Sequence, residues 1–303
     1  MDNYIKPDLL KPGDEIVIVA PAGRVEKAYI EKARAVFSEW GLKVTYGKFL
    51  FEEYNQFAGT DTQRLSDLQS SIDSPNIKAI ICARGGYGTM RLLDKLNWKE
   101  FRKSPKWIVG FSDITAIHNK LHNLGFQSIH GPMPINFKNL ELNDEPLIYL
   151  KQALFEGKVN YKIDADELNR LGESDACITG GNLSILCALQ GTAFDIDLKN
   201  KILFIEEVGE HYYKLDRLLL TLKLAGKLDE LSGLVIGGLT EMEDGKRPFG
   251  KSLNEIIYDH AAEYQYPVAF GFPAGHVKPN LPIMLGAETK LVSNNSSTTL
   301  TFQ

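Results

Sequence analysis

The stretch KWIVGFSDITAIHNKLHNLG, from Lys106 to Gly125, decides the fold class of this chain. Its first part is an apolar run typical of a buried strand, and its second part has the apolar spacing of a helix. The same order of strand and helix recurs through the first half, in EIVIVAPAG with VEKAYIEKARAVFSEWG, LKVTYGKFL with DTQRLSDLQSSIDS, and IKAIICARGGYG with TMRLLDKLN. This alternation predicts a three-layer α/β domain, in which helices cover both faces of a mainly parallel sheet.

We expect residues 1–150 to form this N-terminal α/β domain. From residue 151 to residue 178 the periodic pattern gives way to mixed polar sequence, so we interpret this segment as a linker. Residues 179–303 contain more strand-like segments, among them KILFIEEVGE and LSGLVIGGLT, and one strong amphipathic helix, YYKLDRLLLTLKLAG. The C-terminal part is therefore expected to be a strand-rich α/β domain.

The composition excludes several classes of partner. A hydrophobic content of 44% and a charged content of 24% over 303 residues are those of a globular protein, and the net charge of −5 does not favour nucleic acid. The chain has neither a signal-like start nor an apolar run of about 18 residues, so we expect no membrane partner and a cytoplasmic location. Its three cysteines are too scattered for a disulfide framework or a zinc site.

Two strand ends carry small or polar residues and are expected to lie at the same edge of the sheet. One is ARGGYG, from Ala83 to Gly88, and the other is GFSD, from Gly110 to Asp113. Ligands of parallel sheets bind beyond the carboxyl ends of the strands. Gly85, Gly86 and Gly88 could direct backbone N–H groups toward a phosphate or an oxyanion, or they could simply form a tight turn. Their spacing matches neither a P-loop nor a dinucleotide-binding motif.

Ser112 stands where the apolar strand meets the helix, and the residues alone leave it two roles. As a helix N-cap it would contribute about 1 kcal/mol, although Asp113 could equally be the cap. Alternatively, Ser112 is a nucleophile at a strand-to-helix turn, in a layout like a nucleophile elbow but without the G-x-S-x-G pattern. The positive end of the helix dipole would then favour a developing oxyanion.

A serine nucleophile needs a base and a group that orients the base. Among the six histidines, His276 is our candidate base. It lies in the loop-like stretch GFPAGHVKPN, and a loop of this kind exposes a side chain to a binding site and does not bury it. Glu206 ends an apolar run in LFIEEVGE, where a carboxylate would be at least half buried and would need a partner such as histidine. The following carboxylates, Glu207 and Glu210, are expected to face solvent or to cap a helix.

Two other histidines, His118 and His122, have the i, i+4 spacing of a metal-binding pair. No acidic third ligand accompanies them in a known motif, so we interpret them as surface or interface histidines and expect no metal and no cofactor. A chelator should therefore leave the activity unchanged.

Six segments in this order resemble those of a known family. They read QFAGTDTQRLSDL, ARGGYGTMRLL, GFSDITAIH, TGGNLSIL, LFIEEVGEHYYKLDRLL and GFPAGH. The family is that of the LD-carboxypeptidases, cytoplasmic serine peptidases of peptidoglycan recycling. The resemblance implies a homodimeric hydrolase whose active site lies between a three-layer α/β N-terminal domain and a strand-rich C-terminal domain. Its substrate would be a murein tetrapeptide, which loses its terminal D-alanine at an L,D-bond.

The resemblance also implies roles for individual residues. Ser112 would be the nucleophile, Glu206 the acid and His276 the base of a catalytic triad. The backbone N–H groups of Gly86 and Asp113 would bind the oxyanion. The resemblance therefore favours the nucleophile role for Ser112 over the N-cap role.

The substrate site is expected to hold a cation, because the substrate ends in a carboxylate. Arg84, directly before the glycines, is our candidate, and Gly85, Tyr87 and Asn182 are expected to line the same site. Phe111 stands where other family members carry other residues, which should not affect the triad. Lysine and diaminopimelate both remain candidates for the third residue of the substrate.

Two alternative functions follow from the same residues. One is an amidase that resembles the microcin-immunity peptidases, which cleave a peptidyl-nucleotide with the same triad and need an aromatic platform for the base. The other is a non-catalytic ligand-binding protein of periplasmic-receptor type, with a cleft between two α/β lobes. It predicts an export signal and has no use for a buried Glu206 facing His276.

Overall fold

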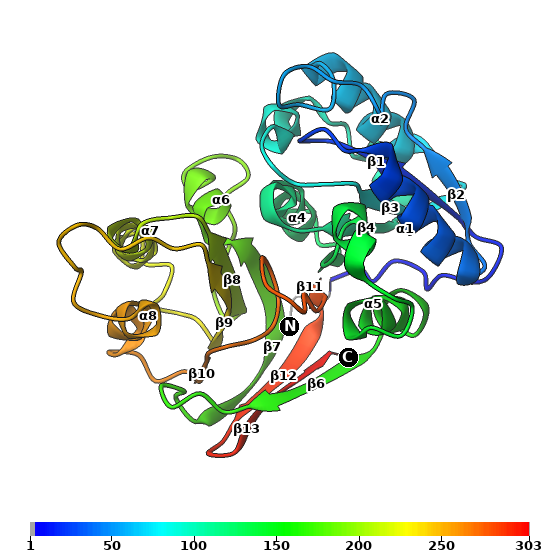
Figure 1. The fold of residues 1–303 in the computed structure, drawn as a ribbon. Helices are drawn as coiled ribbons and strands as arrows, with labels where there is room; N and C mark the ends of the chain where they lie inside the picture. Colours follow the sequence, from blue (N-terminus) through cyan, green and yellow to red (C-terminus); the bar gives the residue numbers. More distant parts are fainter. Residues whose placement is uncertain (1–3, 303) are drawn as a thin grey trace.

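The computed structural model describes residues 4–302 and contains two β-sheets flanked by helices (Figure 1). The first sheet has the strand order β11-β5-β4-β3-β1-β2. Its parallel strands are β1 (Glu15–Val19), β2 (Lys43–Tyr46), β3 (Ile77–Cys82), β4 (Trp107–Gly110) and β5 (Ser128–His130). The mainly parallel sheet predicted for the first half is therefore confirmed.

Helices cover both faces of this sheet because successive strand residues point to opposite sides. Ile16 and Ile18 of β1 pack into one core, and Val17 and Val19 pack into another. The first core includes residues of α1 (Lys27–Glu39) and α5 (Glu145–Phe155). The second includes residues of α2 (Asp61–Asp73), α3 (Lys99–Lys103) and α4 (Thr115–Asn123). Short 3-10 helices complete this half: η1 (Thr89–Arg91), η2 (Leu93–Lys95), η3 (Ser112–Ile114) and η4 (Pro134–Asn139).

The second sheet has the strand order β10-β9-β8-β7-β12-β13-β6. Its strands are β6 (Val159–Asp164), β7 (Gly172–Asn182), β8 (Ile202–Val208), β9 (Gly233–Thr240), β10 (Val268–Ala269), β12 (Glu288–Ser293) and β13 (Ser297–Phe302). One face is covered by α6 (Leu183–Ala188), α7 (Tyr212–Leu224) and α8 (Leu253–Ala261). This agrees with a strand-rich α/β C-terminal part. No helix within residues 4–302 is long and apolar enough to cross a membrane.

The segment expected to be a linker is folded. Residues 151–178 contain the end of α5, all of β6 and the first part of β7. β6 pairs with β13 at the C-terminus, so that Val159 lies opposite Phe302. Buried and exposed residues alternate along β6 and along the start of β7, which gives these strands the polar sequence that suggested a linker.

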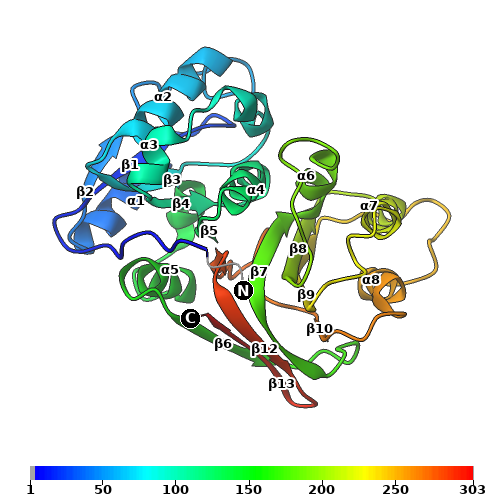
Figure 2. The same cartoon turned by 180° about the vertical axis from the view of Figure 1, so that it is seen from behind.

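The two sheets are connected by more than one crossing of the chain. β11 (Ile283–Leu285) comes from the C-terminal part but pairs antiparallel with β5 of the first sheet, with Ile283 opposite His130. Phe204 of β8 and Val235 of β9 belong to the same hydrophobic core as Ile16 and Ile18. The expected boundary, with residues 179–303 as a separate domain, therefore does not describe β11. In both views α4 of the first half lies beside α6 of the second (Figure 1, Figure 2).

Candidate active site

Ser112 occupies a strained turn between β4 and α4. β4 ends at Gly110, and Ser112 begins the 3-10 helix η3, which leads into α4. Its φ of 64° lies in the left-handed region, which costs a non-glycine residue about 1–3 kcal/mol and is often found at functional sites. No side chain caps η3 or α4, so the N-cap role considered for Ser112 and Asp113 is wrong.

Glu206 and His276 form a hydrogen-bonded pair in the second half of the chain. Glu206 lies on β8 with 0% of its side chain exposed, and its Oε2 is 2.7 Å from Nδ1 of His276. The backbone N–H of His276 donates to the same oxygen at 3.3 Å. Burial lowers the pKa of His276, but the hydrogen bond to Glu206 and the negative charges of Glu206, Glu207 and Glu241 raise it, and the net shift is upward. A carboxylate thus orients this imidazole.

The pair lies against the turn that carries Ser112. The rings of Phe111 and His276 are in contact, with 4.8 Å between their centroids. Phe111 directly precedes Ser112, so the imidazole from the second half lies next to the serine turn from the first. A second contact joins the halves nearby, because the N–H of Asn182 at the end of β7 donates to Oγ1 of Thr115 at the start of α4 at 3.0 Å.

The glycine turn after β3 closes over the same position. A Cβ added at Gly85 would lie 2.8 Å from Cβ and 3.0 Å from Oγ of Ser112, so only glycine allows this approach. The carbonyl of Gly85 accepts a hydrogen bond from the N–H of Gly23 at 3.0 Å. Gly86 follows with a φ of 109°, a conformation that favours glycine. The structure therefore places the expected edge-of-sheet turn beside Ser112.

Comparison with known families is consistent with this arrangement. Residues 16–131 match the LD-carboxypeptidase N-terminal domain, and residues 175–291 match the LD-carboxypeptidase C-terminal domain. The chain belongs to the LD-carboxypeptidase family. This is a family of serine-type carboxypeptidases, so the chain is assigned to the hydrolases.

Individual relatives match over nearly their whole length. The probable murein peptide carboxypeptidase of Bacillus subtilis is 35% identical, over 95% of this chain and 92% of the relative. The murein tetrapeptide carboxypeptidase of Pseudomonas aeruginosa is 29% identical, over 92% of this chain and 93% of the relative. The solved muramoyltetrapeptide carboxypeptidase from Oxalobacter formigenes has a TM-score of 0.87 at 28% identity, over 95% of this chain and 98% of that chain. An MccF-like protein from Bacillus anthracis has a TM-score of 0.85 at 26% identity, over 99% and 100% of the two chains.

In this member of the LD-carboxypeptidase family, His118 and His122 are not surface residues, which corrects our expectation. They are 2% and 5% exposed. Nε2 of His118 lies 2.8 Å from the carbonyl oxygen of Gly110, and its Nδ1 lies 2.8 Å from Oγ of Ser128. Burial lowers the pKa of His118 to about 4, so the ring is neutral and supports the end of β4. Within residues 4–302, no three His, Cys, Asp or Glu side chains are grouped to hold a metal ion.

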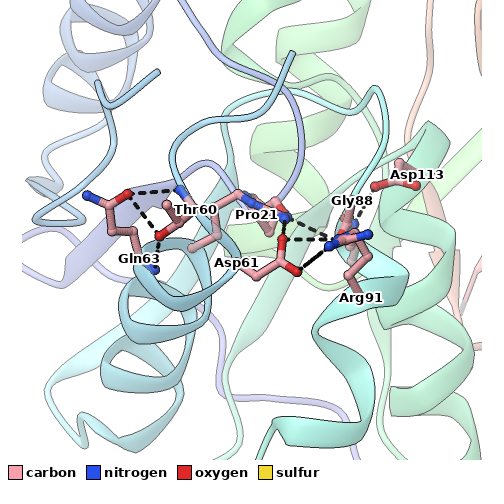
Figure 3. A network of polar contacts seen from close by, with 9 residues as sticks. Pro21, Thr60, Asp61, Gln63, Gly88, Arg91 and Asp113 are labelled. Atoms are coloured by element: carbon pink, nitrogen blue, oxygen red, sulfur yellow. Dashed lines mark hydrogen bonds and ion pairs between the residues drawn. The ribbon is translucent and has the colours of Figure 1, made fainter. Parts of the chain in front are cut away.

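A network that the sequence did not reveal supports the glycine turn (Figure 3). Arg64 of α2 is 1% exposed and donates to the carbonyl oxygens of Pro21 and Gly88, the latter at 3.0 Å. Its guanidinium also pairs with Asp61, which binds Arg91 at 2.8 Å. The helix that carries Arg64 begins with a capping box formed by Thr60 and Gln63, also drawn in Figure 3.

Asp113 supports the same turn from the other side. One of its carboxylate oxygens accepts a hydrogen bond from the N–H of Thr89 at 2.8 Å. Burial raises the pKa of Asp113, and hydrogen bonds from Thr89 and Gly88 oppose this shift. Since Asp113 follows Ser112, its side chain links the serine turn to the glycine turn. The sequence signal available for the rest of the network was the i, i+3 spacing of Asp61 and Arg64 on an expected helix.

We expect the Arg64→Gln variant to lose about 3 kcal/mol of unfolding free energy, because two buried carbonyl groups and Asp61 lose their charged donor. The measurement is urea unfolding followed by circular dichroism. The matched control is Arg34→Gln, which removes an exposed pair with Glu31 on α1 and should change the free energy by less than about 0.5 kcal/mol. Equal stability of the two variants would contradict a supporting role for Arg64.

Two of the expected substrate residues are accessible. Arg84 is exposed, and its guanidinium donates to the carbonyl oxygen of Arg24 at 3.2 Å. Within residues 4–302 no carboxylate forms an ion pair with it, which leaves its charge available for an anion. Tyr87 is 50% exposed and packs on Phe57, with 5.9 Å between the ring centroids.

Asn182 has a structural role. It is 5% exposed, its side-chain oxygen caps α6 by accepting from the N–H of Ile185 at 3.2 Å, and its Nδ2 donates to Glu207 at 2.9 Å. Both ends of the amide thus have partners within the chain, and the expected contact of Asn182 with substrate stays a prediction. Glu207 is 2% exposed and accepts from the N–H of Ser184 at 2.7 Å, so it stabilises the start of α6 and does not face solvent.

Proposed function

We propose that this chain is a serine carboxypeptidase that removes the terminal D-alanine from murein tetrapeptides at an L,D-bond. The main support is the contact of the Glu206–His276 pair with Phe111, directly beside the strained Ser112. Relatives named as murein peptide and murein tetrapeptide carboxypeptidases support the class of substrate. The cytoplasmic location and the homodimer remain predictions from the resemblance.

In the proposed mechanism Ser112, His276 and Glu206 act as a triad. The Nδ1–H of His276 donates to Glu206, which leaves Nε2 free to accept the proton of Ser112. The serine oxygen attacks the carbonyl carbon of the third substrate residue. The imidazolium then gives its proton to the amine of the leaving D-alanine. Water, deprotonated by the same ring, attacks the acyl-enzyme and releases the tripeptide and Ser112.

The negative charge that develops on the carbonyl oxygen needs hydrogen-bond donors. We assign this role to the backbone N–H groups of Asp113 and Gly86, each worth about 3 kcal/mol in the transition state. The approach of the glycine turn to Ser112 supports the assignment. Arg84 would bind the terminal carboxylate, with Gly85 and Tyr87 beside it; no step requires a metal or cofactor.

One alternative is favoured by a specific observation. Tyr87 and Phe57 form an aromatic pair next to the glycine turn, and half of Tyr87 is exposed. Such a surface could stack on a nucleobase, as a microcin-immunity-type peptidase acting on a peptidyl-nucleotide requires. The similarity to an MccF-like protein is compatible with this alternative. Membership of a peptidase family argues against the non-catalytic ligand-binding alternative.

Purified protein incubated with a murein tetrapeptide and, separately, with an aminoacyl nucleotide tests the proposal. We expect mass spectrometry to show loss of D-alanine from the tetrapeptide, with turnover unchanged by EDTA. Cleavage of the nucleotide substrate alone would favour the alternative. Loss of turnover on chelation would contradict the metal-free mechanism.

A further inference from the structure

Glu207 is a second buried carboxylate on β8, directly after Glu206, and it takes no part in the proposed proton transfers. The two carboxylates serve opposite faces of the strand. Phe204 of β8 packs into the core shared with the first sheet, whereas Ile205 packs into the core beneath α6, α7 and α8. Because side chains alternate along a strand, Glu206 lies on the face that meets His276, and Glu207 lies on the face covered by α6.

Three hydrogen-bond donors surround the carboxylate of Glu207. Its Oε1 accepts from Nδ2 of Asn182 and from the N–H of Val208, both at 2.9 Å, and its Oε2 accepts from the N–H of Ser184 at 2.7 Å. Within residues 4–302 no lysine or arginine forms an ion pair with Glu207. A carboxylate suits this position because it only accepts, whereas a glutamine would turn its NH2 group toward one of the three donors.

Asn182 extends this contact to the helix that follows Ser112. Its side chain donates to Glu207, and its backbone N–H donates to Oγ1 of Thr115 at 3.0 Å. Thr115 is 0% exposed and begins α4, three residues after Ser112. The two segments approach closely, since a Cβ added at Gly181 would lie 2.5 Å from the same Oγ1. A continuous chain of contacts therefore joins β8, which carries Glu206, to the start of α4.

The negative charge of Glu207 also acts on the imidazole. Burial lowers the pKa of His276, and the charges of Glu206, Glu207 and Glu241 raise it. Burial raises the pKa of Glu207 itself, and its three hydrogen bonds oppose this shift. Glu207 therefore combines a place at the junction of the two halves with a charge that favours the imidazolium. The other titratable groups that act on Glu207 or His276 are the thiol of Cys187, the ammonium of Lys214, which pairs with Glu210, and the neutral ring of His130.

We propose that Glu207 is a positioning residue that holds the start of α4 against β8 through Asn182 and Thr115. Its charge also stabilises the imidazolium that His276 becomes when it takes a proton. This inference rests on the proposed function, in which that proton comes from Ser112. A role limited to the start of α6 would affect the stability of the fold and leave the titration of His276 unchanged.

Glu207→Gln tests position and charge together. We expect kcat/KM on a murein tetrapeptide to fall about tenfold, because the chain of contacts is disturbed, and its acid midpoint to move to lower pH, because a negative charge is lost. Ser252→Ala, which removes the N-cap of α8 in the same half, is the matched control. It should lower the urea midpoint of unfolding and leave kcat/KM and the pH midpoint unchanged. A Glu207→Gln variant with the same three results would overturn the inference.

Thr115→Val removes the acceptor at the other end of the chain and leaves every charge in place. We expect kcat/KM to fall about tenfold with an unchanged pH midpoint. In combination with Glu207→Gln the total loss should be about ten- to thirtyfold and not about a hundredfold, because both changes act through the same contacts. Thr45→Val, which removes a hydroxyl contact to the carbonyl oxygen of Ile16, is the matched control and should retain wild-type turnover. Wild-type kcat/KM in Thr115→Val, or fully multiplicative losses, would overturn the inference.

NMR titration of the His276 ring separates failure of this inference from failure of the proposed function, because it needs no substrate. The resonance is assigned by its loss in His276→Asn. A wild type that releases no D-alanine would show that the proposed function is wrong. A lower midpoint of His276 in Glu207→Gln would then still support the inference, and an unchanged midpoint would refute it.

Discussion

Replacing Ser112 with alanine is expected to lower kcat on a murein tetrapeptide by at least about 10⁴-fold, because the proposed nucleophile is removed while the backbone donors remain. The measurement is release of D-alanine under saturating substrate. Ser66→Ala, on the exposed side of α2, is the matched control and should retain wild-type turnover. Full turnover by Ser112→Ala would show that another group performs the chemistry.

The backbone at Ser112 adds a second readout to this experiment. Because its φ is 64°, Ser112→Gly should be inactive and yet about 1 kcal/mol more stable to unfolding than Ser112→Ala, since glycine adopts this conformation without steric strain. Urea unfolding of the two variants measures the difference. A glycine variant less stable than the alanine variant would mean that the left-handed conformation is not the source of strain.

Replacing Glu206 with glutamine is expected to lower kcat by about 10³- to 10⁴-fold, because the amide does not stabilise the imidazolium or select the required tautomer. The pH dependence should change as well. In the wild type, His276 must be neutral to act as a base and its pKa is raised, so kcat/KM should fall on acidification with a midpoint above the ordinary histidine value of about 6.5. Without Glu206, burial is the largest remaining influence and is opposed only by the charges of Glu207 and Glu241, so the midpoint should move to lower pH.

Glu243→Gln is a suitable control for this second experiment, because Glu243 is an exposed carboxylate near His211. It should retain both the rate and the midpoint of the wild type. If Glu206→Gln titrates with the wild-type midpoint, Glu206 does not set the pKa of His276. A normal rate in the same variant would remove Glu206 from the proposed triad.

Much of the first sheet could be predicted because buried parallel strands and amphipathic helices leave strong periodic signals. The strand that ends at Gly110 and the helix that follows are an example. The proximity of His276 and Glu206 to the turn that carries Ser112 has a different origin. Spacing along the chain carries no information about a contact across two sheets, so this expectation depended on the chemistry of each residue and on the resemblance.

The features that were not predicted depend on tertiary contacts. β6 was taken for a linker because one of its faces is exposed and it pairs with β13, more than a hundred residues away. Arg64 appeared to be an ordinary helix residue, and only the fold brings it to the carbonyl groups of Pro21 and Gly88. The side-chain oxygen of Asn182 caps α6 and its Nδ2 donates to Glu207 of β8, and neither contact could be predicted from the sequence.

The pairing of β11 with β5 has a consequence for how the enzyme works. The loop that carries His276 is held on both sides. Before it, the carbonyl oxygen of Ala274 accepts a hydrogen bond from the N–H of Gly238, and after it the chain enters β11, an edge strand of the sheet that carries Ser112. A wide opening of the two halves, which would separate the serine turn from the imidazole, would require β11 to separate from β5. We therefore expect folding alone to bring the reactive groups together, so that substrate binds to a rigid site and no large conformational change is needed.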